Sequence, residues 1–126
     1  MTQPPRSQHA VVLFAHGSRD PLWRQPIEAV ATRVRQLNPG VPVRCAYLEL
    51  TEPDLPTVAA ELAALGITSL SVVPLFLGVG RHARDDLPQL VQMLRVRHPT
   101  MAFSLKPSIG EDPQIIDTIA QIALRT

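Results

Sequence analysis

The sequence has little net charge and a single cysteine. Its 126 residues carry a formal charge of only +1, so the chain as a whole lacks the strong positive field typical of proteins that bind nucleic acid or anionic membranes. Cys45 cannot form an intramolecular disulfide, which fits a reducing compartment. We therefore expect no nucleic-acid or membrane partner, and an anionic ligand would have to be held by local arginines.

Long apolar segments, repeats and histidine-rich tracts are also missing. No apolar run approaches the roughly 20 residues of a membrane-spanning helix, and the first residues lack the hydrophobic segment of a secretory signal. Residues 1–9 are polar, contain two adjacent prolines and show no periodicity, which predicts a disordered leader. We expect a cytoplasmic protein with a single domain over residues 10–126.

Short apolar runs alternate with helical periodicities along the rest of the chain. Four short, mainly apolar runs predict strands, at residues 10–15, 43–48, 69–75 and 101–105, and the β-branched residues of the first favour a strand buried on both faces. Apolar positions at helical spacing predict helices after Pro21, from Pro53 or Asp54, from about Arg84 to Val96, and from Asp112 or Pro113. This strict alternation predicts a three-layer α/β fold in which helices cover both faces of a four-stranded parallel sheet.

Chemically active side chains follow the predicted strands. His16 comes directly after the first strand, Glu49 follows the second, and His82 follows the third after the loop Leu77–Arg81. Parallel strands end at the same edge of a sheet, and α/β sheets bind ligands beyond that edge. We therefore expect these side chains to face one site.

Three motifs at these strand ends resemble those of the sirohydrochlorin chelatases, which are class II tetrapyrrole chelatases. In chain order they are HGSRDP at His16–Pro21, AYLEL at Ala46–Leu50 leading into Pro53–Leu55, and PLFL at Pro74–Leu77 followed by Gly80, His82, Asp85 and Leu87–Pro88. The resemblance extends from about residue 10 to the end of the chain. It is a resemblance in particular to the short, single-domain cobaltochelatases of vitamin B12 synthesis.

The resemblance implies an enzyme that inserts a divalent metal into sirohydrochlorin without ATP, here Co²⁺ in cobalamin biosynthesis. It implies a chelatase-like fold, comparable to half of a flavodoxin-like unit, with no permanently bound cofactor. The metal would be a substrate, with Fe²⁺ or Ni²⁺ as alternatives to Co²⁺. Longer class II chelatases consist of two similar lobes, so the short form is implied to act as a homodimer whose second copy supplies the other wall of the cleft.

The family pattern implies that His16 and His82 bind the metal and that His16 accepts protons from the pyrrole nitrogens. Neutral imidazole suits both tasks because it titrates near neutrality and binds borderline divalent metals. Two histidines do not make a closed structural zinc site, which normally has four protein ligands, so a metal held by them can leave. Glu49 is the third catalytic candidate, since a carboxylate can orient an imidazole, complete the metal shell or relay a proton; alternatively, it bonds backbone groups at the next helix.

The third strand end supplies the expected substrate contacts. Gly78 and Gly80 allow backbone to approach a flat ligand, while Leu77 and Val79 offer it an apolar face. Arg81, and with it Arg84 and Arg19, could pair with the peripheral carboxylates of the tetrapyrrole. Glu49 is expected to contact the substrate as well. Asp85 and Asp86 are more economically explained as carboxylates at a helix N-terminus, where the helix dipole favours negative charge.

A siroheme ferrochelatase, which would use the same residues on Fe²⁺, is a close variant of the cobaltochelatase. Two other classes of function compete with the chelatase, and the first is a carrier that would bind metal or tetrapyrrole without catalysis. A flavodoxin-like nucleotide or flavin binder is disfavoured, because Gly17-Ser18-Arg19 lacks the glycine pattern that cradles phosphate.

Overall fold

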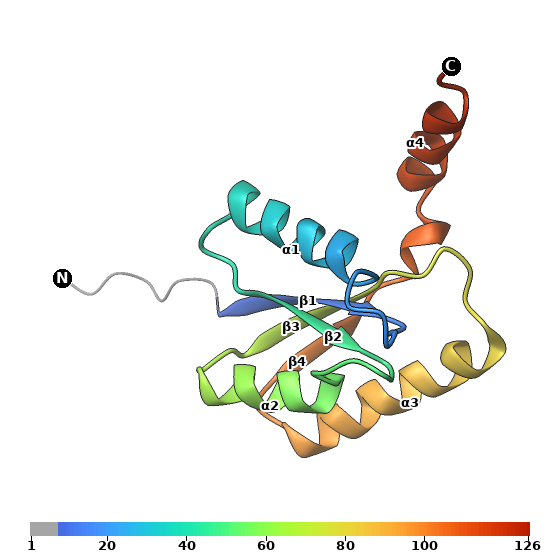
Figure 1. Ribbon diagram of the computed structural model, residues 1–126. Coiled ribbons are helices and arrows are strands. Elements are labelled where there is room, and N and C mark those ends of the chain that lie inside the picture. Colours follow the sequence, from blue (N-terminus) through green and yellow to red (C-terminus); the bar gives the residue numbers. More distant parts are fainter. Residues whose placement is uncertain (1–7) are drawn as a thin grey trace.

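The computed structural model, described here for residues 8–126, contains one parallel sheet between layers of helices (Figure 1). The elements in chain order are β1 (His9–Ala15), α1 (Gln25–Leu37), β2 (Val43–Tyr47), α2 (Leu55–Ala64), β3 (Ser69–Pro74), α3 (Arg81–Arg97), β4 (Ala102–Leu105), the short 3-10 helix η1 (Ile109–Glu111) and α4 (Pro113–Ala123). The strand order is β2-β1-β3-β4, and all neighbouring pairs are parallel. The predicted α/β fold with a four-stranded parallel sheet is confirmed.

The two faces of the sheet are covered by different helices. α1 lies over β1 and β2 on one face, and α2 and α3 lie on the other (Figure 1). Side chains alternate along β1, so that Val12 and Phe14 join the large core under α2 and α3, while Leu13 packs with Ala31 of α1. Burial on both faces explains why β1 and β3 read as mainly apolar runs.

Two predicted boundaries are wrong. His9, which the sequence placed in the leader, is the first residue of β1, and its ring nitrogens lie 2.7 and 3.0 Å from the hydroxyls of Ser69 and Ser71. α3 begins at Arg81, earlier than predicted, because Gly80 adopts the extended conformation of an N-cap residue. Asp85 and Asp86 consequently lie beyond the first turn of α3. The remaining leader, residues 1–7, lies outside the described residues.

The last helix does not cover the sheet. α4 begins at Pro113, with the Asp112 carboxylate accepting a hydrogen bond from the Gln114 amide, and it projects away from the sheet (Figure 1). None of its residues is buried. Within residues 8–126, no helix combines the length and hydropathy needed to cross a bilayer.

Candidate functional site

His16 and Glu49 are in contact at the edge of the sheet where the carboxyl ends of the strands lie. The His16 Nε2 atom lies 3.0 Å from the Glu49 Oε1 atom, and both side chains are about half exposed, at 55% and 54%. Water screens a pair this exposed, so its contribution to stability is small. The carboxylate instead orients the imidazole ring. When Nε2–H donates to the carboxylate, the lone pair of the neutral ring is on Nδ1.

Backbone hydrogen bonds hold the two residues in register. The Leu48 amide donates to the Ala15 carbonyl at 2.9 Å, and the Glu49 amide donates to the His16 carbonyl at 3.0 Å. These bonds continue the pairing of β1 with β2 past the ends of both strands. The loops after the two strands are therefore extensions of the sheet, and the pair stands on a rigid support.

Thr51 adds a side-chain connection between the same two loops. Its hydroxyl donates to the Ser18 carbonyl at 2.7 Å and accepts from the Ser18 amide at 2.9 Å. Both interactions are partly buried. The sequence did not predict this contact, because the partners lie 33 residues apart and neither type is diagnostic by itself.

The glycine that the site requires is Gly17. It has a φ of +103°, and a Cβ atom there would overlap the backbone carbonyl oxygen of Glu49. From the sequence, Gly78 and Gly80 were expected to let the backbone approach a ligand closely. In the structure, a Cβ atom at either position would meet open space. Gly17 was recognised only as part of the His16–Pro21 motif, since its partner cannot be identified without the fold.

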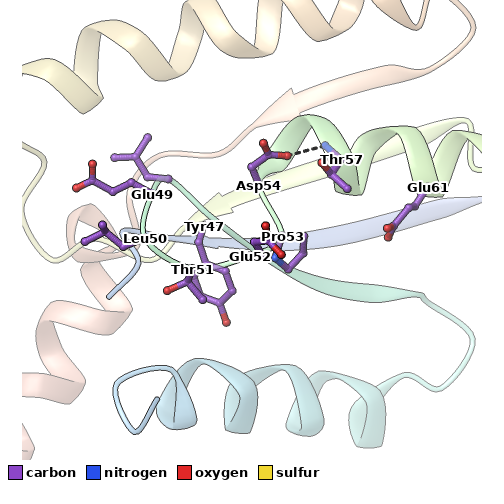
Figure 2. A pocket seen from close by; sticks show the side chains of 10 residues that line it. Tyr47, Glu49, Leu50, Thr51, Glu52, Pro53, Asp54, Thr57 and Glu61 are labelled. Atoms are coloured by element: carbon purple, nitrogen blue, oxygen red, sulfur yellow. Dashed lines mark hydrogen bonds between the residues drawn. The ribbon is translucent and has the colours of Figure 1, made fainter. Parts of the chain in front are cut away.

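A hollow of about 820 Å³ lies beside Glu49, along the loop between β2 and α2 (Figure 2). Glu49 and Leu50 lie at one end of it, and Glu61 of α2 lies at the other. Asp54 caps α2 by accepting from the Thr57 amide at 2.9 Å, and hydrogen bonds from Thr57 hold the pKa of Asp54 below its ordinary value. The cap of α2 is thus Asp54, whereas the Glu49 carboxylate contacts His16.

Tyr47 lines the same hollow. It is buried, and its ring lies 6.1 Å from that of Trp23. Burial, reinforced by the neighbouring Cys45 and Glu28, raises the pKa of Tyr47 to about 12. Burial also raises the pKa of the Cys45 thiol. Both groups are neutral near pH 7, as expected for side chains that fill space, and Cys45 packs with the core under α1.

The residues that follow β3 lie at the same edge of the sheet but are not part of the contact between His16 and Glu49. Leu77 is 70% exposed, and Val79 lines a hollow of about 260 Å³ against α3. Gly78, Gly80 and Arg81 are exposed, and Arg81 is the first residue of α3. His82 is the second residue of that helix, and its side chain is outside the described part of the chain. The structure thus brings His16 and Glu49 together, and the roles of the others remain predictions.

The described side chains include no group of three or more His, Cys, Asp and Glu residues placed to hold a metal ion. What they do supply is one imidazole and one carboxylate in contact, at an exposed edge. Such a pair can take up protons, and it offers a divalent cation nitrogen and oxygen donors.

Comparisons with known proteins identify relatives of this fold and sequence. The family model described as CbiX matches residues 10–126. The sirohydrochlorin cobaltochelatase of Methanopyrus kandleri is 37% identical over 82 residues, which are 65% of this chain and 57% of that protein. The sirohydrochlorin ferrochelatase of Bacillus subtilis is 29% identical over 113 residues, 89% of this chain and 43% of that protein. The chain thus spans less than two thirds of the length of the first curated relatives it matches, 57%, 59% and 56%.

Solved structures share the architecture. A putative cobalamin (vitamin B12) biosynthesis CbiX protein from Marinobacter aquaeolei VT8 has a TM-score of 0.80 and 33% identity, over 91% of this chain and 93% of that one. The sirohydrochlorin chelatase SirB from Bacillus subtilis subspecies spizizenii, solved with cobalt, has a TM-score of 0.70 and 28% identity, over 90% of this chain and 48% of that one. The chelatase-like character predicted for the fold is confirmed.

Proposed function

The chain belongs to the CbiX family, and on that premise we propose that it is a sirohydrochlorin cobaltochelatase, which inserts Co²⁺ into sirohydrochlorin without ATP in cobalamin biosynthesis. The observation that carries the proposal is the contact between His16 and Glu49 at the carboxyl edge of the sheet. Insertion exchanges two pyrrole N–H protons for one M²⁺ ion, so the site needs a base that also tolerates a metal. An imidazole oriented by a carboxylate meets both needs.

We assign the two tasks of His16 to one nitrogen at different times. With Nε2–H directed at Glu49, Nδ1 binds the incoming metal together with His82. Transfer of the metal to the ring frees Nδ1, which then accepts the two pyrrole protons one after the other, the first passing on to water before the second is taken up. Glu49 stabilises the imidazolium that results, and because the pair is exposed, the proton can pass on to water.

The loop between β3 and α3 is the proposed contact surface for the macrocycle. Leu77 and Val79 would pack against its face, Gly78 and Gly80 would leave room for it, and Arg81 would pair with a peripheral carboxylate. Glu49, in the loop after β2, would contact the pyrrole nitrogens. One exposed edge forms only half a cleft, so we propose that a second copy of the chain supplies the second wall.

Metal identity distinguishes the leading proposal from its nearest alternative. The match to a Bacillus subtilis ferrochelatase favours, as second candidate, insertion of Fe²⁺ for siroheme by the same residues. The two proposed imidazole ligands, His16 and His82, accept Co²⁺, Fe²⁺ or Ni²⁺, so the metal supply of the cell decides among them. The metal is a substrate in each case. The cytoplasm is the proposed compartment, because its reducing conditions suit a chain with one unpaired cysteine.

The test is metal insertion followed by the absorption of the ring. Sirohydrochlorin is incubated anaerobically with the protein and Co²⁺ or Fe²⁺, and the spectral change is compared with that of the protein-free reaction. We expect rapid insertion by the wild type and a loss of at least about 100-fold in His16→Ala and His82→Ala. Glu61→Gln, at the far end of the hollow, is the control and should keep the wild-type rate. Wild-type rates in both histidine variants would refute the assignment, and binding of the ring without insertion would support a carrier.

A further inference from the structure

The hollow against α3 lies between the carboxyl ends of β3 and β4 and the start of that helix. Its volume is about 260 Å³, which is below the roughly 300–1,000 Å³ of pockets that enclose a whole drug-sized ligand. Apolar side chains form much of its lining, among them Pro74, Val79, Leu87 and Leu105. The hollow is therefore too small for a flat macrocycle, but it has room for one short side chain of such a molecule.

Charged side chains surround the same hollow. Lys106, directly after β4, and Arg84 of α3 line it and are exposed, and Glu111 of η1 lines it as well. Two cations and one carboxylate leave an excess of positive charge. Within residues 8–126, neither Lys106 nor Arg84 belongs to an ion pair, so both are available to an incoming anion. An apolar hollow with a positive rim suits a carboxylate at the end of a short aliphatic chain.

Backbone hydrogen bonds fix the position of Lys106. Its amide donates to the Val72 carbonyl at 2.9 Å, which continues the pairing of β4 with β3. Further along, the Gly110 amide donates to the Phe76 carbonyl at 3.0 Å, and a Cβ atom at Gly110 would overlap the Leu77 carbonyl oxygen. The segment from β4 to η1 is therefore held against the loop between β3 and α3 (Figure 1).

The hollow adjoins the surface proposed for the macrocycle. Val79 belongs to both, because it lines the hollow and lies in the loop proposed to contact the face of the ring. Ala83 and Arg84 also line the hollow, and they directly follow His82 in the first turn of α3. A macrocycle with one side chain in the hollow would thus lie beside both the loop and the start of α3.

We propose that the hollow binds one carboxylate-bearing side chain of the macrocycle, and that Lys106 pairs with its carboxylate. The inference rests on the proposed function and adds a second anchor to the one proposed at Arg81. Sirohydrochlorin carries acetate and propionate side chains, which combine a short aliphatic chain with a terminal anion. Their methylene groups would contact Leu87 and Leu105, and the carboxylate would stay at the exposed rim.

A second anchor determines how the ring is oriented. A single ion pair at Arg81 would let the ring turn about that point, whereas a further contact at Lys106 fixes its rotation in its own plane. The pyrrole nitrogens are then placed relative to His16 and His82. Lys106 is therefore a specificity-determining residue, because a tetrapyrrole without a carboxylate at the matching position loses this contact.

Lys106 is the only lysine of the chain, so its contact with the macrocycle can be observed directly. Protein made with ¹³C-labelled lysine should show one correlation from the CH₂ group next to the ammonium nitrogen. Metal-free sirohydrochlorin should shift this signal, with the same half-saturation as the change in the absorption of the ring. A saturated complex in which the lysine signal stays in place would overturn the proposal.

Titration of metal-free sirohydrochlorin into variants provides a second measurement. Lys106→Met should weaken binding about 10-fold, as expected for the loss of one charge-assisted contact, and Lys106→Arg should stay within about threefold of the wild type. Arg97→Met is the matched control, because it removes the same charge in the last turn of α3, at the other end of the helix. Unchanged binding in Lys106→Met, or an equal loss in Arg97→Met, would contradict a direct contact.

Insertion kinetics separate this inference from the proposed activity. Lys106→Met should raise the KM for sirohydrochlorin about 10-fold and leave the KM for Co²⁺ unchanged. A wild type that inserts Co²⁺ but needs no Lys106 for binding the ring would refute the inference and leave the chelatase proposal intact. Binding of the ring that depends on Lys106, without insertion by the wild type, would do the reverse. A wild type that does not bind the ring would refute both.

Discussion

Gly17 passes so close to Glu49 that a Cβ atom at Gly17 would occupy the place of the Glu49 carbonyl oxygen. The same glycine has a φ of +103°, which side chains disfavour for a second, independent reason. Both of its neighbours, His16 and Ser18, form hydrogen bonds with the loop after β2. The position of the candidate base therefore depends on the absence of one side chain.

Gly17→Ala should separate the two loops and disorder the His16–Glu49 pair. We expect a loss of about 1–3 kcal/mol in the free energy of unfolding, measured by chemical denaturation, together with slower metal insertion. Gly78→Ala is the matched control, because a Cβ there meets open space, and its stability should change by less than about 0.5 kcal/mol. Equal effects of the two substitutions would contradict this account.

Thr51→Val should loosen the same loops without a steric clash. It keeps the shape of the side chain but removes both hydrogen bonds to Ser18, so we expect about 1–3 kcal/mol less stability. Thr51→Ser retains the hydroxyl and should restore most of the loss. If valine and serine behave alike in denaturation and in metal insertion, the hydroxyl has no part in holding the site.

Glu49→Gln should impair catalysis more than stability. The pair with His16 is half exposed, so its loss costs little in unfolding free energy, whereas a neutral amide no longer stabilises the imidazolium. We expect insertion to slow by about 10–100-fold while the melting temperature stays nearly constant. A variant that inserts metal at the wild-type rate would remove Glu49 from the mechanism.

Asp54→Ala should cost about 1 kcal/mol at neutral pH, because it removes the cap of α2. The pKa of Asp54 is lowered in the folded protein, so its charged form stabilises the fold above the unfolded pKa of about 3.9. This contribution disappears as the pH falls through the folded pKa. The difference in unfolding free energy between the wild type and Asp54→Asn should therefore shrink in acid. A difference that stays constant from pH 7 to acid would contradict the prediction.

Tyr47 should titrate near pH 12 in the folded protein, where burial favours the neutral phenol. It is the only tyrosine, so the ultraviolet absorption of phenolate reports on it alone. Because the folded pKa is raised, the associated stability is complete below the unfolded pKa of about 10 and is lost as the pH rises toward 12. The denatured chain should titrate near pH 10, and Tyr47→Phe should show no transition. A native transition near pH 10 would mean that the phenol is hydrated.

The elements that the sequence predicted well are those whose signals are local. β1, β2 and β3 were recognisable because both of their faces are largely buried. The caps of α2 and α4 were recognisable because Asp54 and Asp112 precede proline-containing first turns. The start of α3 was misjudged because Gly80, a residue without a capping side chain, precedes it. α4 was recognisable as a helix, but its pattern of isoleucines gave no indication that it would leave the sheet.

By itself, the sequence determined the order of strands and helices, the parallel sheet and the placing of His16 and Glu49 at one edge, because apolar periodicity and right-handed crossovers restrict an alternating chain to few topologies. Only the tertiary structure decided that these two side chains touch, that Gly17 and Thr51 hold them in place, and that α4 stands apart from its own sheet. These features depend on contacts between segments about 30 residues or more apart, and no local pattern encodes the distance between two such segments.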